Sequence, residues 1–147
     1  MPLNIIIPCY NESTRLPVNK YLDFLKLNKK VKIIFVDDGS TDNTKNLLRK
    51  LSRKLPQQIK ILAYEKNKGK GNAVRDGFLY AVNQNMTGNL AYLDADLSTS
   101  LEECKLLSKK INDKIKFVFG SRIPKSSNVI KRKFHRFIIG RSIATII

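Results

Sequence analysis

The sequence has little of several features, and each shortage excludes a class of protein. Its two cysteines, Cys9 and Cys104, lie too far apart to form a metal or redox motif. The single histidine, His135, stands among basic residues, and the sequence shows no Ser/His/Asp pattern of a hydrolase. We expect His135 to be a surface or interfacial residue or to face a phosphate. No apolar run approaches the roughly 20 residues of a membrane-spanning helix, and the apolar run Leu3–Pro8 is too short for a signal peptide. We therefore expect a reducing, cytoplasmic compartment.

Acidic residues are also scarce, with 12 Asp and Glu against 28 Lys and Arg and a net charge of +16. The imbalance is greatest in residues 114–147, which hold nine basic residues and no acid. Large apolar residues alternate with arginines there, as expected of an amphipathic segment. Such a segment predicts an anionic partner, which could be a phosphate group, a membrane surface or a nucleic acid.

The alternation of apolar segments predicts one α/β domain. With 147 residues and 42% apolar residues, the chain can form a single hydrophobic core. Short apolar runs predict five strands: Leu3–Pro8, Val31–Val36, Ile59–Tyr64, Leu90–Leu93 and Ile115–Phe119. Helical spacing predicts four helices between them: Pro17–Leu27, Asn43–Leu55, Ala73–Val82 and Ser100–Ile111. Such βαβ units form a mainly parallel sheet with right-handed crossovers.

Two carboxylates, Asp94 and Asp96, follow the predicted strand Leu90–Leu93. Residues two apart point to the same face of an extended segment, so this spacing predicts that both carboxylates reach one spot. Hard oxygen ligands of this kind suit Mg²⁺ or Mn²⁺. The alternative is a strand end followed by a helix whose N-cap is Asp96 or Ser98.

Acidic residues also follow the first two predicted strands. Glu12 follows the first strand, and the pair Asp37 and Asp38 follows the second. Because the carboxyl ends of parallel strands meet at one edge, these groups and the later aspartates predict a nucleotide–metal site. The glycine- and lysine-rich stretch Lys68–Gly71 could wrap a phosphate at a helix N-terminus, or could be an ordinary loop. Gly77, in the middle of a predicted helix, indicates close packing or room for a ligand.

Five segments together carry a resemblance to family-two glycosyltransferases with the GT-A fold. Three of them resemble the P-x-Y-N-E opening, the second signature and the metal motif of that family: Pro8–Glu12, Val36–Asp42 and Asp94–Asp96. Asn67–Gly77 resembles a segment shared by dolichyl- and polyprenyl-phosphate sugar synthases, and Phe119–Arg122 a family strand end. These segments occur in the family's order over residues 3–122.

The resemblance implies a Rossmann-like, three-layer α/β/α fold and a set of roles. Asp94 and Asp96 would be catalytic and hold Mg²⁺ or Mn²⁺, with Arg122 a further catalytic residue near the phosphates. The nucleotide sugar would contact Pro8, Tyr10, Glu12, Val36, Asp37, Asp38, Lys70, Asp94 and Ala95. The acceptor phosphate would contact Arg122, Lys131, Arg132 and Arg136.

The activity implied by the resemblance is an inverting transfer of a hexose from a nucleotide sugar to dolichyl or polyprenyl phosphate. UDP-glucose is the favoured donor, because the GSR and RKFHR segments look like glucosyl-phosphate lipid synthases, and GDP-mannose is second. The alternatives are a soluble or polysaccharide acceptor and a non-catalytic nucleotide-binding fragment. A nucleic-acid binder would rest on charge alone, and we do not expect one.

The resemblance also divides the chain. Residues 1–122 would form the nucleotide-sugar-binding core. Residues 123–147 would form a basic amphipathic segment that faces the acceptor or a membrane, or a helix that packs on the core. Because the family usually continues further, we expect a C-terminally truncated member whose activity alone is open. We expect a peripheral position on the cytoplasmic side of a membrane, and allow for a homo-oligomer.

Overall fold

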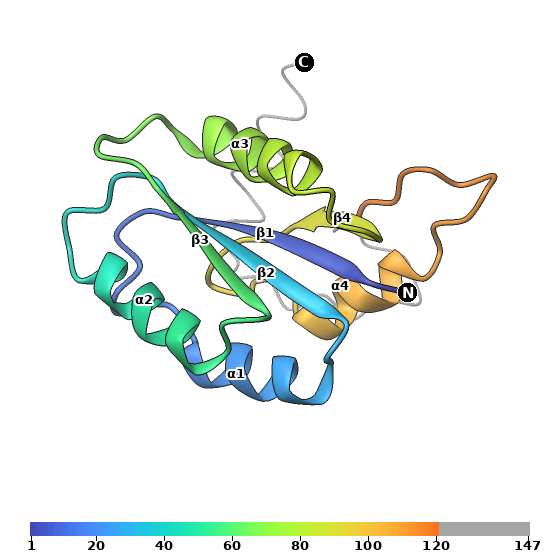
Figure 1. Cartoon of the computed structure of the whole chain (residues 1–147), viewed down its shortest axis with the longest axis horizontal. Helices are drawn as coiled ribbons and strands as arrows, with labels where there is room; N and C mark the ends of the chain where they lie inside the picture. Colours follow the sequence, from blue (N-terminus) through green and yellow to red (C-terminus); the bar gives the residue numbers. More distant parts are fainter. Residues whose placement is uncertain (121–147) are drawn as a thin grey trace, which may run out of the picture.

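A four-stranded, fully parallel sheet forms the centre of the computed structural model, which describes residues 1–120. The strands are β1 (Leu3–Cys9), β2 (Val31–Asp37), β3 (Ile59–Ala63) and β4 (Asn89–Tyr92). Their order in the sheet is β3-β2-β1-β4 (Figure 1). The chain therefore reverses its direction of travel across the sheet between β1 and β4, and ligands of open α/β sheets bind at such a switch point.

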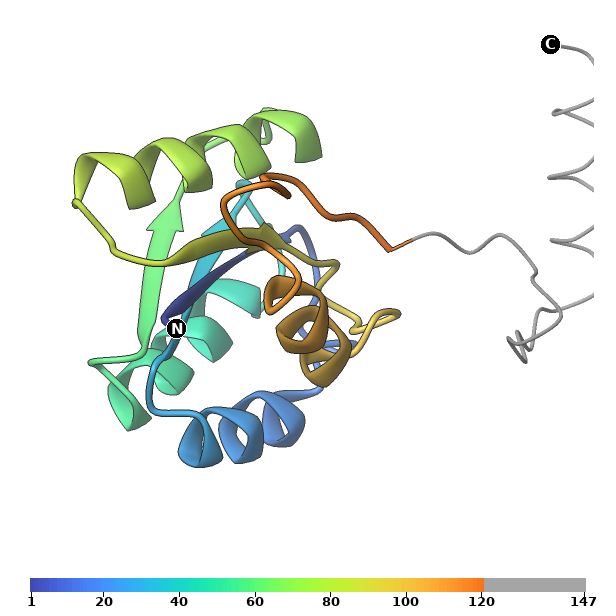
Figure 2. The same ribbon diagram turned by 90° about the vertical axis from the view of Figure 1, so that its right-hand side faces the viewer.

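Helices cover both faces of the sheet, which gives the predicted three layers (Figure 2). One face is covered by α1 (Val18–Leu27), α2 (Thr44–Lys54) and α4 (Leu101–Ser108), and the other by α3 (Lys70–Asn83). The alternation of side chains along β1 serves both faces. Ile5 and Ile7 join the core under α1, α2 and α4, whereas Ile6 joins the core under α3.

Gly77 lets α3 lie close to the sheet. A Cβ atom at this position would lie 2.5 Å from Ile6 Cγ2 and 3.2 Å from Val36 Cγ2. The mid-helix glycine is therefore explained by close packing, the first of the two alternatives that the sequence left open.

All four helices begin at other residues than the sequence predicted, by three residues at α3 and by one at each of the others. The α3 helix begins at Lys70 rather than Ala73, directly after Gly69, whose φ of 91° gives the chain a turn into the helix. The α4 helix begins after Ser100, whose hydroxyl accepts from the Glu103 N–H while the Glu103 carboxylate accepts from the Ser100 N–H. This capping box leaves Asp96 and Ser98 outside the helix, so neither is its N-cap.

The predicted strand Ile115–Phe119 was wrong, because these residues form no strand in the structure. Asn112 instead makes a turn whose Oδ1 accepts from the Lys114 and Ile115 N–H groups, each at 2.9 Å. Phe117 and Phe119 are 78% and 73% exposed. The apolar residues of this segment suit a strand, but a strand also needs the edge of a neighbouring strand with which to form hydrogen bonds. Within residues 1–120, this segment pairs with no strand.

Several earlier predictions concern residues outside the described range. Arg122, Lys131, Arg132, Arg136 and the predicted 123–147 segment all lie there. Among residues 1–120, both cysteines are buried and free. No helix in this range is long and apolar enough to cross a membrane.

Candidate functional site

The loops after β1 and β2 are joined through the side chain of Asn11. Its Oδ1 accepts from the Thr41 N–H at 2.9 Å and the Asp42 N–H at 3.3 Å. The backbone N–H of Asn11 donates to Ser40 Oγ at 3.0 Å. Asn11 has a φ of 53°, a left-handed conformation that asparagine tolerates better than most residues. The two family signatures therefore fold as one unit at the carboxyl edge of the sheet.

Asp42 adds a second connection between the same loops. Its Oδ1 accepts from the Thr44 N–H at 2.9 Å, and its Oδ2 accepts from the Ser13 N–H at 3.1 Å. Desolvation would raise the pKa of this carboxyl. The hydrogen bonds from Thr44 and Ser13 outweigh it and lower the pKa well below its usual range. Asp42 is thus an ionised anchor of the two loops.

The adjacent aspartates 37 and 38 both support backbone turns. Asp37 is buried and its Oδ1 accepts from the Ser40 N–H at 3.1 Å. Asp38 uses both oxygens to receive the loop before α3, from Lys68 N–H at 2.7 Å and Gly69 N–H at 3.0 Å. A third loop is therefore fixed to the first two, before any ligand binds.

The segment with Asp94 and Asp96 is a turn rather than the extended strand end that the sequence predicted. The strand β4 ends at Tyr92, and the Leu97 N–H donates back to the Asp94 carbonyl at 3.1 Å. Leu97 has a φ of 54°, which is strained for a bulky residue. The spacing predicted that the two carboxylates would meet, but it is this backbone reversal that brings both to one cavity.

Two contacts hold this turn in place. The hydroxyl of Tyr21, a fully buried residue of α1, donates to the Ala95 carbonyl at 3.0 Å. The Ser98 N–H donates to Asp96 Oδ1 at 2.9 Å, which orients that carboxylate. Tyr21 was not among the residues predicted from the sequence, since nothing in its helical spacing distinguishes it from a core residue.

A cavity of about 380 Å³ lies where these loops meet. Its lining includes most of the predicted nucleotide and metal residues, together with Cys9, Asn67 and Gly69, which were not among the individually predicted site residues. The full lining is Pro8, Cys9, Tyr10, Glu12, Asp38, Asn67, Gly69, Lys70, Asp94, Ala95 and Asp96. Asn67 and Gly69 belong to a motif already recognised, so their inclusion could have been predicted. Val36 and Asp37 do not line it. Val36 packs beneath α3, and Asp37 holds its turn.

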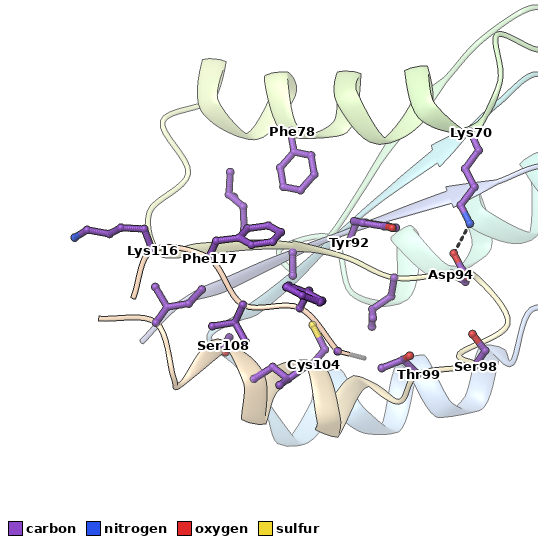
Figure 3. Close-up of a pocket in the computed structure, with 18 residues that line it drawn as sticks. Lys70, Phe78, Tyr92, Asp94, Ser98, Thr99, Cys104, Ser108, Lys116 and Phe117 are labelled. Atoms are coloured by element: carbon purple, nitrogen blue, oxygen red, sulfur yellow. Dashed lines mark hydrogen bonds and ion pairs between the residues drawn. The ribbon is translucent and has the colours of Figure 1, made fainter. Parts of the chain in front are cut away.

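Charges in the cavity are partly compensated. Lys70 Nζ, at the start of α3, lies 2.5 Å from Asp94 Oδ1 (Figure 3). Arg15 Nη2 lies 2.8 Å from Glu12 Oε1, while Glu12 Oε2 is buried without a partner among the described residues. Burial raises the pKa of Glu12; Arg15 offsets part of the effect and the charge of Asp96 adds to it. A buried acceptor of this kind suits a donor supplied by a ligand.

A second cavity of about 340 Å³ adjoins the first and shares Lys70 and Asp94 with it. It lies between α3, β4, α4 and residues 116–120, and its wall is mostly apolar, with Phe78 from α3 and Phe117 from the 116–120 segment (Figure 3). The sequence did not indicate this cavity, because residues 116–119, which form part of its wall, were predicted to be part of a strand in the sheet.

The donor set of the first cavity fits a hard divalent cation. Within residues 1–120 no three His, Cys, Asp or Glu side chains form a cluster that could enclose a metal. Asp94 and Asp96 would thus provide two carboxylates, and water and ligand phosphates the other positions. Mg²⁺ is commonly bound in this way, whereas structural zinc requires a closed set of protein ligands.

Together these features define a Rossmann-like α/β domain with its ligand site at the carboxyl edge of the sheet. The family model of glycosyl transferase family 2 matches residues 4–145, and the chain belongs to this family. The family resemblance in the sequence is thereby confirmed.

Two relatives illustrate the match. The chain is 32% identical over 120 residues to human dolichyl-phosphate beta-glucosyltransferase, covering 76% of this chain and 36% of the relative. It is 34% identical over 152 residues to the protein of the same name from Dictyostelium discoideum, covering 93% and 45%. The chain therefore spans less than half the length of these two relatives.

Two solved structures share the fold. S. aureus TarS 1-349 in complex with UDP is 27% identical with a TM-score of 0.50, covering 65% of this chain and 28% of TarS. The mannosyltransferase PcManGT from Pyrobaculum calidifontis, in complex with GDP-Man and Mn²⁺, is 24% identical with a TM-score of 0.50, covering 64% and 27%. The prediction of a GT-A fold is confirmed.

Proposed function

We propose that this chain forms the donor-binding part of an inverting glycosyltransferase that moves glucose from UDP-glucose to dolichyl or polyprenyl phosphate. The observation that carries the proposal is the cavity at the carboxyl edge, where two carboxylates, a helix N-terminus and Lys70 meet. The names of the relatives support the lipid phosphate acceptor and glucose as the sugar. GDP-mannose remains the second donor.

The nucleotide would occupy the part of the cavity formed by the loops after β1 and β2. Tyr10 is 45% exposed, so its ring offers a face on which a base can stack. Glu12 Oε2 would accept from a ribose hydroxyl or a base N–H. The first-turn N–H groups of α3 and the Lys70 ammonium would face the diphosphate. A Cβ atom at Gly71 would meet nothing within 4 Å, which leaves room there for phosphate oxygens.

Asp94 and Asp96 would hold the divalent ion, Mg²⁺ or Mn²⁺. When bound, such an ion offsets the charge that develops on the leaving nucleoside diphosphate. The Tyr21 and Ser98 contacts keep the two carboxylates oriented toward the cavity before the ion arrives. This is the positioning that a two-carboxylate site requires of the surrounding protein.

The acceptor in this proposal is an ionised phosphate, whose oxygen is a nucleophile at neutral pH without a strong general base. Such an acceptor needs cations to offset its repulsion with the donor diphosphate. We assign that role to Arg122, Lys131, Arg132 and Arg136. The basic, apolar segment 123–147, which contains the last three of these residues, would lie on the cytoplasmic surface of a membrane as a peripheral anchor.

Calorimetric titration of the chain with UDP, UDP-glucose, GDP and GDP-mannose, with and without Mn²⁺, tests the proposal. We expect metal-dependent binding of the UDP ligands and its loss in the double variant Asp94→Asn/Asp96→Asn. Binding of the GDP ligands instead would move the proposal to GDP-mannose. Absence of binding by a folded chain would contradict the proposal for these 147 residues.

A second candidate is nucleotide binding without turnover, which the partial coverage of the relatives favours. Transfer of radiolabelled glucose to polyprenyl phosphate in vesicles separates the two. Labelled lipid supports the enzyme, whereas UDP binding without labelled lipid supports the second candidate. Labelling of a soluble or polysaccharide acceptor would instead contradict the lipid acceptor.

A further inference from the structure

The contact between Lys70 and Asp94 joins two residues that the proposed function needs separately. Lys70 begins α3 and Asp94 follows β4, and their charged atoms lie 2.5 Å apart at the boundary of the two cavities (Figure 3). Asp94 Oδ1 is thus occupied by an ammonium group in the free protein. A divalent cation and an ammonium repel each other at one carboxylate oxygen, so binding of the ion to Asp94 weakens the contact of Asp94 with Lys70.

We propose that Lys70 changes partner when the site is loaded, from Asp94 in the free protein to the diphosphate of the nucleotide in the complex. The inference rests on the proposed function, because it takes Asp94 as a metal ligand and a nucleoside diphosphate as the second ligand. In the free protein the lysine neutralises Asp94 beside Asp96. In the complex the divalent cation takes over that role, and the lysine offsets phosphate charge.

The surroundings of Lys70 allow this exchange without movement of the backbone. Gly77 lets α3 pack closely against Ile6, and the hydroxyl of Tyr64, directly after β3, donates to Asp76 Oδ2 on α3 at 2.6 Å. The Lys70 side chain is 60% exposed and that of Asp94 46%. Exposed ion pairs are weak, so a stronger anion near the same lysine can break this one. Lys70 is also the first residue of α3, and phosphate oxygens would lie at this helix N-terminus, close to the lysine.

The exchange makes metal binding and nucleotide binding cooperative. In this proposal, a metal ion that binds alone competes with the Lys70 ammonium for Asp94 and leaves the lysine without an anion. Metal together with a nucleoside diphosphate displaces the same ammonium and gives it a new anion. Each ligand therefore raises the affinity for the other, by the same factor.

The test replaces Lys70 with methionine, which has similar length and no charge. Mn²⁺ binding is measured from the paramagnetic resonance signal of the free ion, first with the protein alone and then with UDP. We expect Lys70→Met to raise the affinity for Mn²⁺ alone about two- to fivefold, the value of an exposed ion pair. We expect the same change to lower UDP affinity at saturating Mn²⁺ about tenfold or more, the value of a hydrogen bond to a charged group.

The matched control is Lys60→Met, which removes the same charge from β3, where Lys60 Nζ donates to the Pro56 carbonyl at 3.2 Å. The control should change neither affinity more than about twofold, an allowance for the altered net charge. If Lys70→Met leaves the affinity for Mn²⁺ alone unchanged or lowers it while the wild type binds Mn²⁺ and UDP, the exchange is wrong and the proposed function stands. If the folded wild type binds neither ligand, both are overturned.

Discussion

The two halves of the cavity are built differently. On the β1–β2 half, Asn11, Asp38 and Asp42 tie three loops together through hydrogen bonds to backbone N–H groups. On the β4 half, the Asp94–Asp96 turn is closed by the Leu97 N–H, and it is held by the Tyr21 hydroxyl, the Ser98 N–H and one exposed ion pair. The half proposed to recognise the nucleotide is therefore preformed, whereas the half proposed to hold the metal depends on few contacts and can exchange partners.

The largest effect is expected at Gly39, in the preformed half. Gly39 has a φ of 68°, and a Cβ atom there would lie 2.5 Å from the backbone of Lys66 and Asn67. Gly39→Ala therefore combines left-handed strain with a backbone clash, and should lower the free energy of unfolding by about 3 kcal/mol. Urea denaturation measures this, and a loss below about 1 kcal/mol would show that the loops are not tightly joined.

The next largest effect is expected at Tyr21, beneath the metal half. Tyr21→Phe leaves the buried Ala95 carbonyl without its donor, and should cost about 1–2 kcal/mol of unfolding free energy. Because the same bond holds the aspartate turn, Mn²⁺ affinity should fall as well. The matched control is Tyr64→Phe, which loses the bond to Asp76 on α3 and should keep its Mn²⁺ affinity. Equal loss of Mn²⁺ affinity in both variants would contradict the positioning role.

A smaller effect, dependent on pH, is expected at Glu12. Its pKa in the folded protein lies above the ordinary value of 4.5, so the ionised form is disfavoured by folding. The ionised carboxylate therefore lowers the free energy of unfolding. This effect is fully present at pH values above the raised pKa of Glu12 and absent at pH values below about 4.5. Glu12→Gln should therefore be more stable than the wild type at neutral pH, by less than about 1 kcal/mol, because the exposed Arg15 pair is lost too.

Denaturation at a series of pH values measures this difference. It should shrink as the pH falls through the raised pKa of Glu12 toward 4.5. The variant should also bind UDP more weakly, since it replaces one acceptor oxygen by an amide donor. If the difference in unfolding free energy between the variant and the wild type stays constant with pH, folding does not disfavour the ionised Glu12 carboxylate, and the prediction is wrong.

The smallest change in stability is expected at Gly71, in the first turn of α3. Unlike Gly39, it has open space around a Cβ atom, and nothing in the free protein requires glycine there. Gly71→Ala should leave stability unchanged or raise it by about 0.5 kcal/mol. If phosphate oxygens use this space, calorimetry should show weaker UDP binding. If Gly71→Ala binds UDP as tightly as the wild type, the diphosphate does not occupy the space beside Gly71.

The sequence predicted most of the fold because its signals were local. The apolar runs of β1 and β2 and the spacing of α1 and α2 needed no information about distant residues. Prediction failed at 115–119, where pairing with a neighbour decides, and at the aspartate turn, where Leu97 takes a left-handed conformation that its residue type does not suggest. Local preference can be read from composition, but an edge or a strained turn is imposed by the surroundings.

The site shows the same division. The motifs named the residues that line the cavity, but not what the side chains do in the free protein. Nothing in the sequence indicated that Asp38 uses both oxygens for the loop before α3, or that Tyr21 supports Ala95 from below. These contacts join residues far apart in the chain, and a single sequence does not reveal such pairings.

The strand order has a consequence for how the molecule assembles. Leu3 pairs with Val31 on one side and with Asn89 on the other, so the β1–β2 half of the sheet closes a much shorter loop than the β1–β4 half. Contacts between distant residues form more slowly, since a longer chain must be ordered first. The three joined loops should consequently form early in folding, and the aspartate turn should reach its place only when β4 docks. In a newly made chain, the proposed metal site would be completed last.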